Sequence, residues 1–406
     1  MLRYYEIFVP GGFPRHTYNP RAELRLENRL MEAKRNLCKL VTVTGQTKSG
    51  KTVLARKILP PEECIWVDGG TVSEEDDFWH VVIEQLELFQ SKQKEIATEV
   101  SGKIGVSTKA IRAEIGRKKF SGIKSTQTLS SRVIALRGLK ESLIPLVVDD
   151  FHYIPKELQG SIVRALKPLI FDGLPAVIIA IPHRRYDALK VEKEMTGRIF
   201  TIDIPIWSED ELRYIPTKGF DLLNYDVSSP TANKIAKEAI GSPHLMQDYC
   251  RGISKYIQIE YALRRRMLNL PESDLNKIFI EVAETIGRPI FEKLARGPRQ
   301  RTDRIQRQLK NGQAVDIYEL VLHGMAYIKP GLVSIEYEEL RSAIRNVSAS
   351  QIPQLQEIAR VLKHMATIAA TDQSSTPVID FEESEKKLHI TDPFFAFYLR
   401  WGELGH

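Results

Sequence analysis

Cysteine is scarce in this chain, and long apolar runs are absent. The three cysteines, Cys38, Cys64 and Cys250, are widely spaced and odd in number. The sequence therefore predicts neither a disulfide framework nor a cysteine metal site, and a reducing cytoplasm is the expected compartment. The longest apolar runs, at 143–148 and 176–181, are too short to span a bilayer. The amino terminus also lacks the apolar core and cleavage site of a secretory signal.

The overall composition is compatible with many classes of globular protein. The chain has 406 residues, of which 43% are hydrophobic and 27% are charged, and its formal net charge is +6. These values are ordinary for a globular protein, and the length leaves room for two or three domains. A small basic excess is compatible with a polyanionic partner but does not identify one.

One glycine-rich segment predicts a specific chemistry. Residues 45–52 fit the pattern G-x-x-x-x-G-K-T, with a β-rich run at 39–44 before them and a helical pattern after them. In this motif backbone N–H groups and a helix amino terminus bind phosphate, the lysine reaches the β- and γ-phosphates, and the threonine hydroxyl binds Mg²⁺. A chance glycine-rich turn is the alternative. The segment predicts ATP binding with contacts from Gly45, Gln46, Thr47, Lys48, Ser49, Gly50, Lys51, Thr52 and Val53.

A second motif is an apolar strand that ends in two acids. Residues 143–148 are followed by Asp149 and Asp150. One carboxylate at such a strand end holds the Mg²⁺ shell, and its neighbour orients or deprotonates the attacking water. We assign the metal role to Asp149, together with Thr52, and the catalytic role to Asp150, together with Lys51. The alternative is that Asp150 caps a helix that begins near Pro155. Aspartate is shorter than the glutamate usual at this position, so we expect slow hydrolysis.

Strands and helices alternate over residues 37–205, which predicts a doubly wound α/β domain with a parallel sheet. The run at 176–181 should lie beside the strand that ends in the two acids. It leads into His183, Arg184 and Arg185, which either sense the γ-phosphate or are a solvated strand end. Residues 90–135 are rich in lysine and arginine, and we interpret them as an insertion outside the core, such as a β-ribbon with flexible flanks.

Three further stretches carry a resemblance to a known family. Together with the two motifs above, they resemble the AAA+ and STAND branches of P-loop ATPases, and most closely the archaeal-type and origin-recognition-like ATPases. Residues 17–21, which include Tyr18, resemble the box that meets the adenine. Pro243 and His244 resemble the G-x-P motif that contacts the base, although the arginine usual in AAA+ proteins at this place is absent. Residues 388–400, Leu-His-Ile-Thr-Asp-Pro-Phe-Phe-Ala-Phe-Tyr-Leu-Arg, resemble the ending of archaeal-type ATPases.

The expected architecture has four parts. The resemblance and the patterns together predict an amino-terminal segment at 1–36, the P-loop domain at 37–205, a helical lid at 206–270 and a helical and winged-helix region at 271–406. The winged helix is expected from a helix at 352–370 followed by strands at 377–381 and 387–390. The aromatic residues after these strands are expected to seal the core.

Six basic residues lie between 296 and 310, namely Arg296, Arg299, Arg301, Arg304, Arg307 and Lys310. The spacing of 301, 304 and 307 would place three arginines along one helical face. This face either contacts a phosphate backbone, is solvated, or docks on acids elsewhere in the chain.

We draw three functional hypotheses. The first is a slowly hydrolysing ATP-dependent molecular switch in signalling, defence or partner recruitment. The second is an ATPase that assembles on duplex DNA, and the third is a nucleotide-binding scaffold that hardly hydrolyses. No effector motif is visible in the sequence, so the output of a switch must come from a separately encoded effector protein, which is the expected partner, or from the winged helix. ATP and Mg²⁺ are the expected cofactors.

Arg198 gives a test of oligomeric assembly. It precedes the last predicted strand, where AAA+ proteins often place an arginine that completes a neighbour's site. An ordinary surface arginine is the alternative. If Arg198 has the first role, the active form is a homo-oligomer, and Arg198→Ala should abolish ATP hydrolysis while leaving nucleotide affinity intact. Unchanged ATPase activity in the variant would rule out this role.

Overall fold

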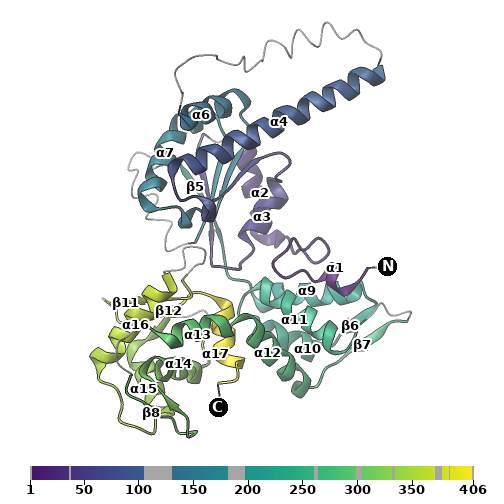
Figure 1. Cartoon of the computed structure of the whole chain (residues 1–406). Helices are drawn as coiled ribbons and strands as arrows, with labels where there is room; N and C mark the ends of the chain where they lie inside the picture. The colour runs from purple at the N-terminus through teal and green to yellow at the C-terminus, as the bar shows by residue number, and fades with distance from the viewer. Residues whose placement is uncertain are drawn as a thin grey trace. The chain divides into compact units, whose positions relative to one another are not determined.

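The computed structural model describes residues 2–35, 38–104, 130–181, 197–259, 264–298, 304–331, 334–370, 377–383 and 385–404 (Figure 1). They divide into two compact units. One contains Met1–Glu27, Gly45–Leu54 and Asp203–His406, and the other contains Asn28–Thr44 and Ala55–Ile202. We call the first the lid unit and the second the sheet unit. Among the described helices, none is long and apolar enough to cross a membrane.

The sheet unit is built on five strands in the order β2-β3-β4-β1-β5. These are β1 (Leu40–Gly45), β2 (Ile65–Asp68), β3 (Leu146–Asp149), β4 (Ala176–Ala180) and β5 (Ile199–Ile204). The pairs β1–β4, β3–β4 and β2–β3 are all parallel. The expected parallel sheet is thereby confirmed, and the run at 176–181 lies beside the strand that ends in the two acids.

Both faces of this sheet are buried, which explains why its strands read as continuous apolar runs. One face packs against α4 (Glu75–Ile104), α6 (Ser131–Ser142) and α7 (Lys156–Phe171). Figure 1 shows α2 (Leu26–Met31) and α3 (Lys51–Ile58) on the other side from α6 and α7. Alternate strand residues point to each face, and the second set is also buried: Val41, Val43, Val147, Val177 and Ile179.

The segment at 90–135 differs from its prediction. Helix α4 continues to Ile104, and α6 occupies 131–142, so the two ends of the segment, which were expected to be flexible, are helical. Residues 105–129 lie outside the described part of the chain. The following strand begins at Leu146, later than predicted, because Leu143 adopts the left-handed conformation that ends α6.

The first part of the lid unit is helical, as expected. It contains α1 (Tyr4–Ile7), α9 (Glu209–Asp221), α10 (Ser229–Glu238) and α11 (Pro243–Tyr256). Two short strands, β6 (Tyr225–Val227) and β7 (Arg266–Leu268), pair in parallel. These strands were not predicted, because three residues are too few to show an alternating pattern.

The second part of the lid unit begins with α12 (Glu272–Ile286) and α13 (Arg288–Arg296). It continues with α14 (Ile317–Ile328), β10 (Ser334–Glu336), α15 (Tyr337–Val347), α16 (Leu355–Ala370), β11 (Ile379–Glu382) and β12 (Lys387–Ile390), and α17 (Pro393–Trp401) closes it. The three strands form an antiparallel sheet in the order β10-β12-β11. Helix, strand, two helices and two strands in this order make a winged-helix-like region.

The predicted arginine face at 301–307 is wrong over its described residues. Arg304 precedes the short strand β8 (Arg307–Gln308), which pairs with β9 (Ala314–Val315). The Arg304 guanidinium is largely buried against Asp316 at 2.5 Å. Arg307 lies 3.8 Å from Glu357. Both side chains therefore dock on acids of the chain itself, which was one of the alternatives. Arg299 and Arg301 lie outside the described residues.

Candidate functional site

The backbone of the phosphate-binding loop requires glycine at two positions. A Cβ on Gly45 would lie 2.9 Å from the carbonyl oxygen of Ile204, so no larger residue fits at the end of β1. Gly50 has φ of +92°, a conformation that other residues rarely adopt, and it directly precedes α3. Lys48 also has a positive φ, of 60°. The loop is therefore held in an unusual path that ends at the amino terminus of a helix.

Lys51 lies at the start of α3 and folds back over the loop. Its Nζ donates hydrogen bonds to the carbonyl oxygens of Gly45, at 2.9 Å, and Gln46, at 2.8 Å. The residue is only 8% exposed. Thr52 and Val53 follow on the first turn of the same helix. Both of these acceptors are neutral carbonyls of the loop, so the ammonium group of Lys51 lies where charge-assisted hydrogen bonds to an anion in the loop can form.

Ser49 is the second buried polar group of the loop. In the described part of the chain its Oγ atom has no hydrogen-bond partner, and neither does Oε1 of Gln46. Thr47 lies between them on the exposed turn and is half-buried. Because an unsatisfied buried hydroxyl costs about 1–3 kcal/mol, the Ser49 hydroxyl favours a ligand with polar atoms at this loop. The loop residues thus fit a phosphate group.

Arg21 joins the amino-terminal segment to the lid. Its guanidinium binds the Glu211 carboxylate at 2.7 and 3.0 Å and donates to the carbonyl of Pro205 at 3.0 Å. The same group lies 4.7 Å from the ring centroid of Trp207. Burial acts to raise the pKa of Glu211, but the hydrogen bonds from Arg21 and Ser208, together with the charge of Arg21, outweigh it and the pKa is lowered. The pair is therefore ionised and held in one geometry.

Trp207 carries this network to the phosphate-binding loop. Its indole N–H donates to the carbonyl oxygen of Ser49 at 2.9 Å. One ring therefore contacts both the Arg21 guanidinium and the loop. Trp207 and Glu211 were not predicted as site residues, although Glu211 is visible in the sequence as the last residue of a capping box that begins at Ser208.

The expected adenine box is fixed to the lid helices on both sides of Tyr18. Thr17 accepts a hydrogen bond from Gln247 of α11 at 2.7 Å, and Asn19 donates to the carbonyl oxygen of Glu211 in α9 at 3.0 Å. Tyr18 itself stacks on Phe13, with ring centroids 6.4 Å apart. Burial, followed by the neighbouring carboxylate of Glu27, raises the pKa of Tyr18.

Pro243 and His244 open helix α11. The His244 and Phe394 rings form a T-shaped pair with centroids 4.8 Å apart, and Nε2 of His244 lies 3.7 Å from a carboxylate oxygen of Asp248. Burial, together with the nearby charge of Lys48, lowers the pKa of His244 to about 4. His244 is therefore neutral at pH 7 and cannot replace the missing arginine as a cation. Its role in base binding stays a prediction.

The two acids lie in the sheet unit, at the end of β3. Asp149 accepts a hydrogen bond from the Asp150 backbone N–H at 3.0 Å through Oδ1. Asp150 has φ of 50°, a strained conformation that is enriched at functional sites. It does not cap α7, because the residue at that position is Pro155. The alternative role considered for Asp150 is therefore wrong, whereas its catalytic role stays a prediction.

Of the remaining candidates in the sheet unit, the structure describes Arg198 but not the predicted sensors. Arg198 is exposed, and its guanidinium lies 5.3 Å from the ring centroid of Phe171. Its backbone carbonyl accepts a hydrogen bond from Leu40 in β1 at 2.9 Å. The candidate sensors at 183–185 lie outside the described residues.

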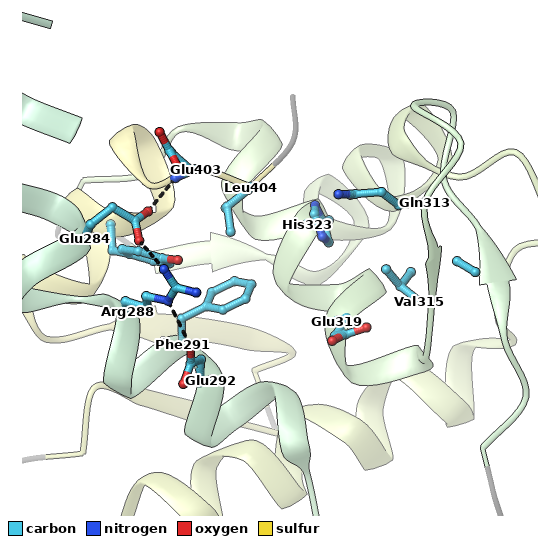
Figure 2. Close-up of a pocket in the computed structure, with 12 residues that line it drawn as sticks. Glu284, Arg288, Phe291, Glu292, Gln313, Val315, Glu319, His323, Glu403 and Leu404 are labelled. Atoms are coloured by element: carbon cyan, nitrogen blue, oxygen red, sulfur yellow. Dashed lines mark hydrogen bonds and ion pairs between the residues drawn. The ribbon is translucent and has the colours of Figure 1, made fainter. Parts of the chain in front are cut away.

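A cavity of about 490 Å³ lies in the second part of the lid unit (Figure 2), and none of the residues predicted for the site lines it. Four glutamates line it, and two of them pair with Arg288: Glu292 at 2.9 Å and Glu284 at 3.3 Å. Glu284 also accepts a hydrogen bond from the backbone of Glu403 at 2.7 Å. This acidic lining disfavours a triphosphate.

Comparison with known proteins gives a fold. No protein-family model and no curated protein matches the sequence. Among solved structures, a Walker-type ATPase of Pyrococcus abyssi is similar, with a TM-score of 0.52 and 20% identity over 92% of this chain and 94% of that one. The ORC2 protein of Aeropyrum pernix aligns with a TM-score of 0.47 and 15% identity over 98% and 96% of the two chains. The similarity to the Pyrococcus protein confirms the P-loop ATPase fold.

Asp248 gives a prediction for the pH dependence of stability. Burial raises the pKa of this carboxyl group to about 7 from 3.8. Between these values the folded chain keeps a proton that the unfolded chain has lost, so the free energy of unfolding falls as the pH rises. The amide of the variant Asp248→Asn cannot ionise, so the variant does not lose stability in this way. The variant should gain stability over the wild type as the pH rises from 4 to 7.

Urea unfolding of both proteins at several pH values measures the difference. His244 has a lowered pKa and contributes the opposite slope in the same window. Because it lies 3.7 Å from Asp248, the two proteins are also compared on a His244→Gln background, which removes this slope. A difference in stability that stays constant from pH 4 to 7 would show that Asp248 titrates normally.

Proposed function

We propose that this chain is an ATP-binding, slowly hydrolysing switch ATPase that acts in signalling, defence or partner recruitment. The observation that supports this most is the hydrogen bond from Trp207 to the Ser49 carbonyl, at 2.9 Å. It joins the phosphate-binding loop to the residues that hold the lid. A change at the phosphates therefore has a direct physical route to the lid helices.

The residues of the loop are proposed to hold the triphosphate. Backbone N–H groups from Gly45 to Val53 would bind the phosphates, with the ammonium of Lys51 released from its carbonyl partners to meet them. Tyr18, Pro243 and His244 are the proposed base contacts. The Thr52 hydroxyl and the Asp149 carboxylate are oxygen donors, which suits Mg²⁺. When bound, this ion would screen charge on the phosphates.

Hydrolysis is proposed to be slow. Asp150 would orient and deprotonate the attacking water. Its side chain is shorter than that of a glutamate and reaches less far toward the water. A second copy of the chain would supply Arg198, which is exposed and free of ion pairs in the described structure. If hydrolysis requires an arginine from a neighbouring copy, the chain stays in the ATP-bound state until it assembles. This behaviour suits a switch whose ATP-bound state a separate effector protein recognises.

Two substitutions separate binding from hydrolysis. Lys51→Ala removes a charged donor to the phosphates and should weaken ATP binding by about tenfold or more. Asp150→Asn keeps the shape of the side chain but not its basicity, so binding should persist while turnover falls by about a hundredfold or more. Equilibrium ATP binding and phosphate release measure the two effects.

Lys57→Ala on the exposed side of α3 is the matched control for Lys51→Ala and should change neither quantity. A wild-type turnover of many per second would contradict the proposed slow hydrolysis. ATP binding that survives Lys51→Ala unchanged would show that the loop does not hold the triphosphate.

A second candidate function is assembly on duplex DNA, and one observation favours it. Helix α16 is the third helix of the winged-helix-like region, which is the position of a recognition helix in helix-turn-helix proteins. Its exposed residues Gln356, Arg360 and Thr367 recur at helical spacing along one side, whereas Lys363 on the same side pairs with Glu383 at 2.6 Å. Side chains of these kinds contact bases and phosphates. The arginines at 304 and 307 do not support this function, because both pair with acids of the chain.

DNA binding is tested by gel shift with duplex DNA at low and high salt. If α16 contacts DNA, Arg360→Ala should weaken binding, and raising the salt should weaken it further. Arg164→Ala, an exposed arginine on α7 of the sheet unit, is the matched control. Absence of a shift even at low salt would remove this candidate, and DNA-stimulated hydrolysis would favour it over the switch.

A further inference from the structure

The carboxy-terminal helix α17 begins with a fixed cap. Asp392 is 6% exposed, and its Oδ1 accepts a hydrogen bond from the Phe395 backbone N–H at 2.9 Å. Pro393 then occupies the first position of the helix. Phe395 and Phe397 are completely buried in the core of the lid unit. Their burial fixes the helix, so the direction of the one partly exposed phenylalanine in this run, Phe394, is set by the fold.

Phe394 does not join its neighbours in the core. The Nζ of Lys48 lies 5.1 Å from the centroid of the Phe394 ring, and the His244 ring meets it at 4.8 Å with an interplanar angle of 87°. These residues come from the phosphate-binding loop and from the start of α11. One ring of α17 therefore contacts two segments for which a nucleotide contact is proposed above.

The other end of α17 is attached to helix α10, in the first part of the lid unit. Glu238 of helix α10 is 4% exposed. Its Oε2 forms an ion pair with Arg400, at 3.0 Å, and accepts a hydrogen bond from the indole N–H of Trp401, at 2.8 Å. A carboxylate buried to this degree is stable only while its donors stay in place. Helix α17 is thus a bridge with Phe394 at the loop and Glu238 at the lid.

The face of a phenylalanine ring attracts a cation, and at an exposed site the attraction is modest. Lys48 is exposed, whereas Lys51 is buried in the same loop. His244 is neutral at pH 7, as argued above, which leaves Lys48 as the cation at this ring. A triphosphate in the loop carries several negative charges and competes with the ring for the same ammonium group.

We propose that Phe394 is a positioning residue of the nucleotide site, which holds Lys48 away from the phosphates until a triphosphate binds. Release of Lys48 from the ring then reports an occupied loop to α17 and, through Glu238, to the lid. This inference rests on the proposed ATP binding. It adds that the carboxy-terminal region sets the affinity for the triphosphate, because a contact that must be broken on binding lowers the apparent affinity.

Phe394→Leu keeps an apolar side chain but removes the aromatic face. It should tighten ATP binding by about threefold, the value of one exposed cation–π contact. Phe394→Tyr keeps the face and should bind like the wild type. Tyr327→Leu removes an exposed aromatic ring from α14 and should leave ATP affinity unchanged. Equilibrium titration with ATP measures the affinity of the wild type and the three variants.

The decisive comparison places Phe394→Leu on a Lys48→Met background. Lys48→Met should weaken ATP binding, because the released ammonium no longer reaches the phosphates. On this background Phe394→Leu should have no further effect, since the cation that the ring holds is gone. An unchanged affinity in the single variant Phe394→Leu, or a threefold effect that persists without Lys48, would overturn the proposal.

A second measurement keeps the two proposals distinguishable. Thermal unfolding of the nucleotide-free wild type, both single variants and the double variant gives the coupling between Lys48 and Phe394 without ATP. The shifts in Tm should be non-additive. Non-additive shifts in a protein that binds no ATP would mean that the contact between Lys48 and Phe394 exists but that the proposed function is wrong. The proposed role of Phe394 in nucleotide binding would then be wrong as well. Additive shifts would overturn the contact itself.

Discussion

Burial of the Arg21 guanidinium is the constraint on which the rest of the lid unit depends. The side chain is 4% exposed, so its charge must be satisfied inside the protein. Glu211, two backbone carbonyls and the Trp207 ring together satisfy it. Removing any one of these partners would leave a buried charge with incomplete hydrogen bonding. The amino-terminal segment, the first lid helix and the connection between them are therefore fixed as one body.

The phosphate-binding loop is attached to this body. Trp207 contacts the guanidinium with its ring face and the Ser49 carbonyl with its N–H group. A rearrangement of the loop must either keep this hydrogen bond, and move the tryptophan, or break it. Each outcome changes the packing around Arg21. Helix α17 provides a second connection from the loop, through Phe394, to Glu238 of the lid. The two routes begin at neighbouring residues, Lys48 and Ser49.

The fold was predictable where one physical rule decides the structure. Strands β1, β3 and β4 are buried on both faces, so they are continuous apolar runs that the sequence displays directly. The loop between Gly45 and Lys51 was predictable because phosphate binding demands glycine and lysine at fixed spacing. Helix α6 and the extension of α4 were missed because their lysine and serine content resembles that of a loop. The arginine face at 301–307 was wrong because its partners, Asp316 and Glu357, are not evident from periodicity.

The candidate site was predictable in its motifs but not in its connections. Arg21 was visible within the adenine box, yet its partner Glu211 lies 190 residues away. Phe394 was expected to seal the core, as Phe395 and Phe397 do. Its direction toward Lys48 follows from the cap at Asp392 and the turn of the helix, which only the folded chain reveals. Long-range pairs of this kind depend on tertiary packing and leave no local pattern.

The central claim is that an occupied phosphate-binding loop changes the lid. Hydrogen exchange of backbone amides, measured with and without ATP, tests it most directly, because exchange rates report local opening segment by segment. ATP should slow exchange in the loop and also alter it in α9 and at the start of α11, and Lys51→Ala should abolish both changes. A change confined to the loop, with α9 and α11 exchanging at their nucleotide-free rates, would contradict the account.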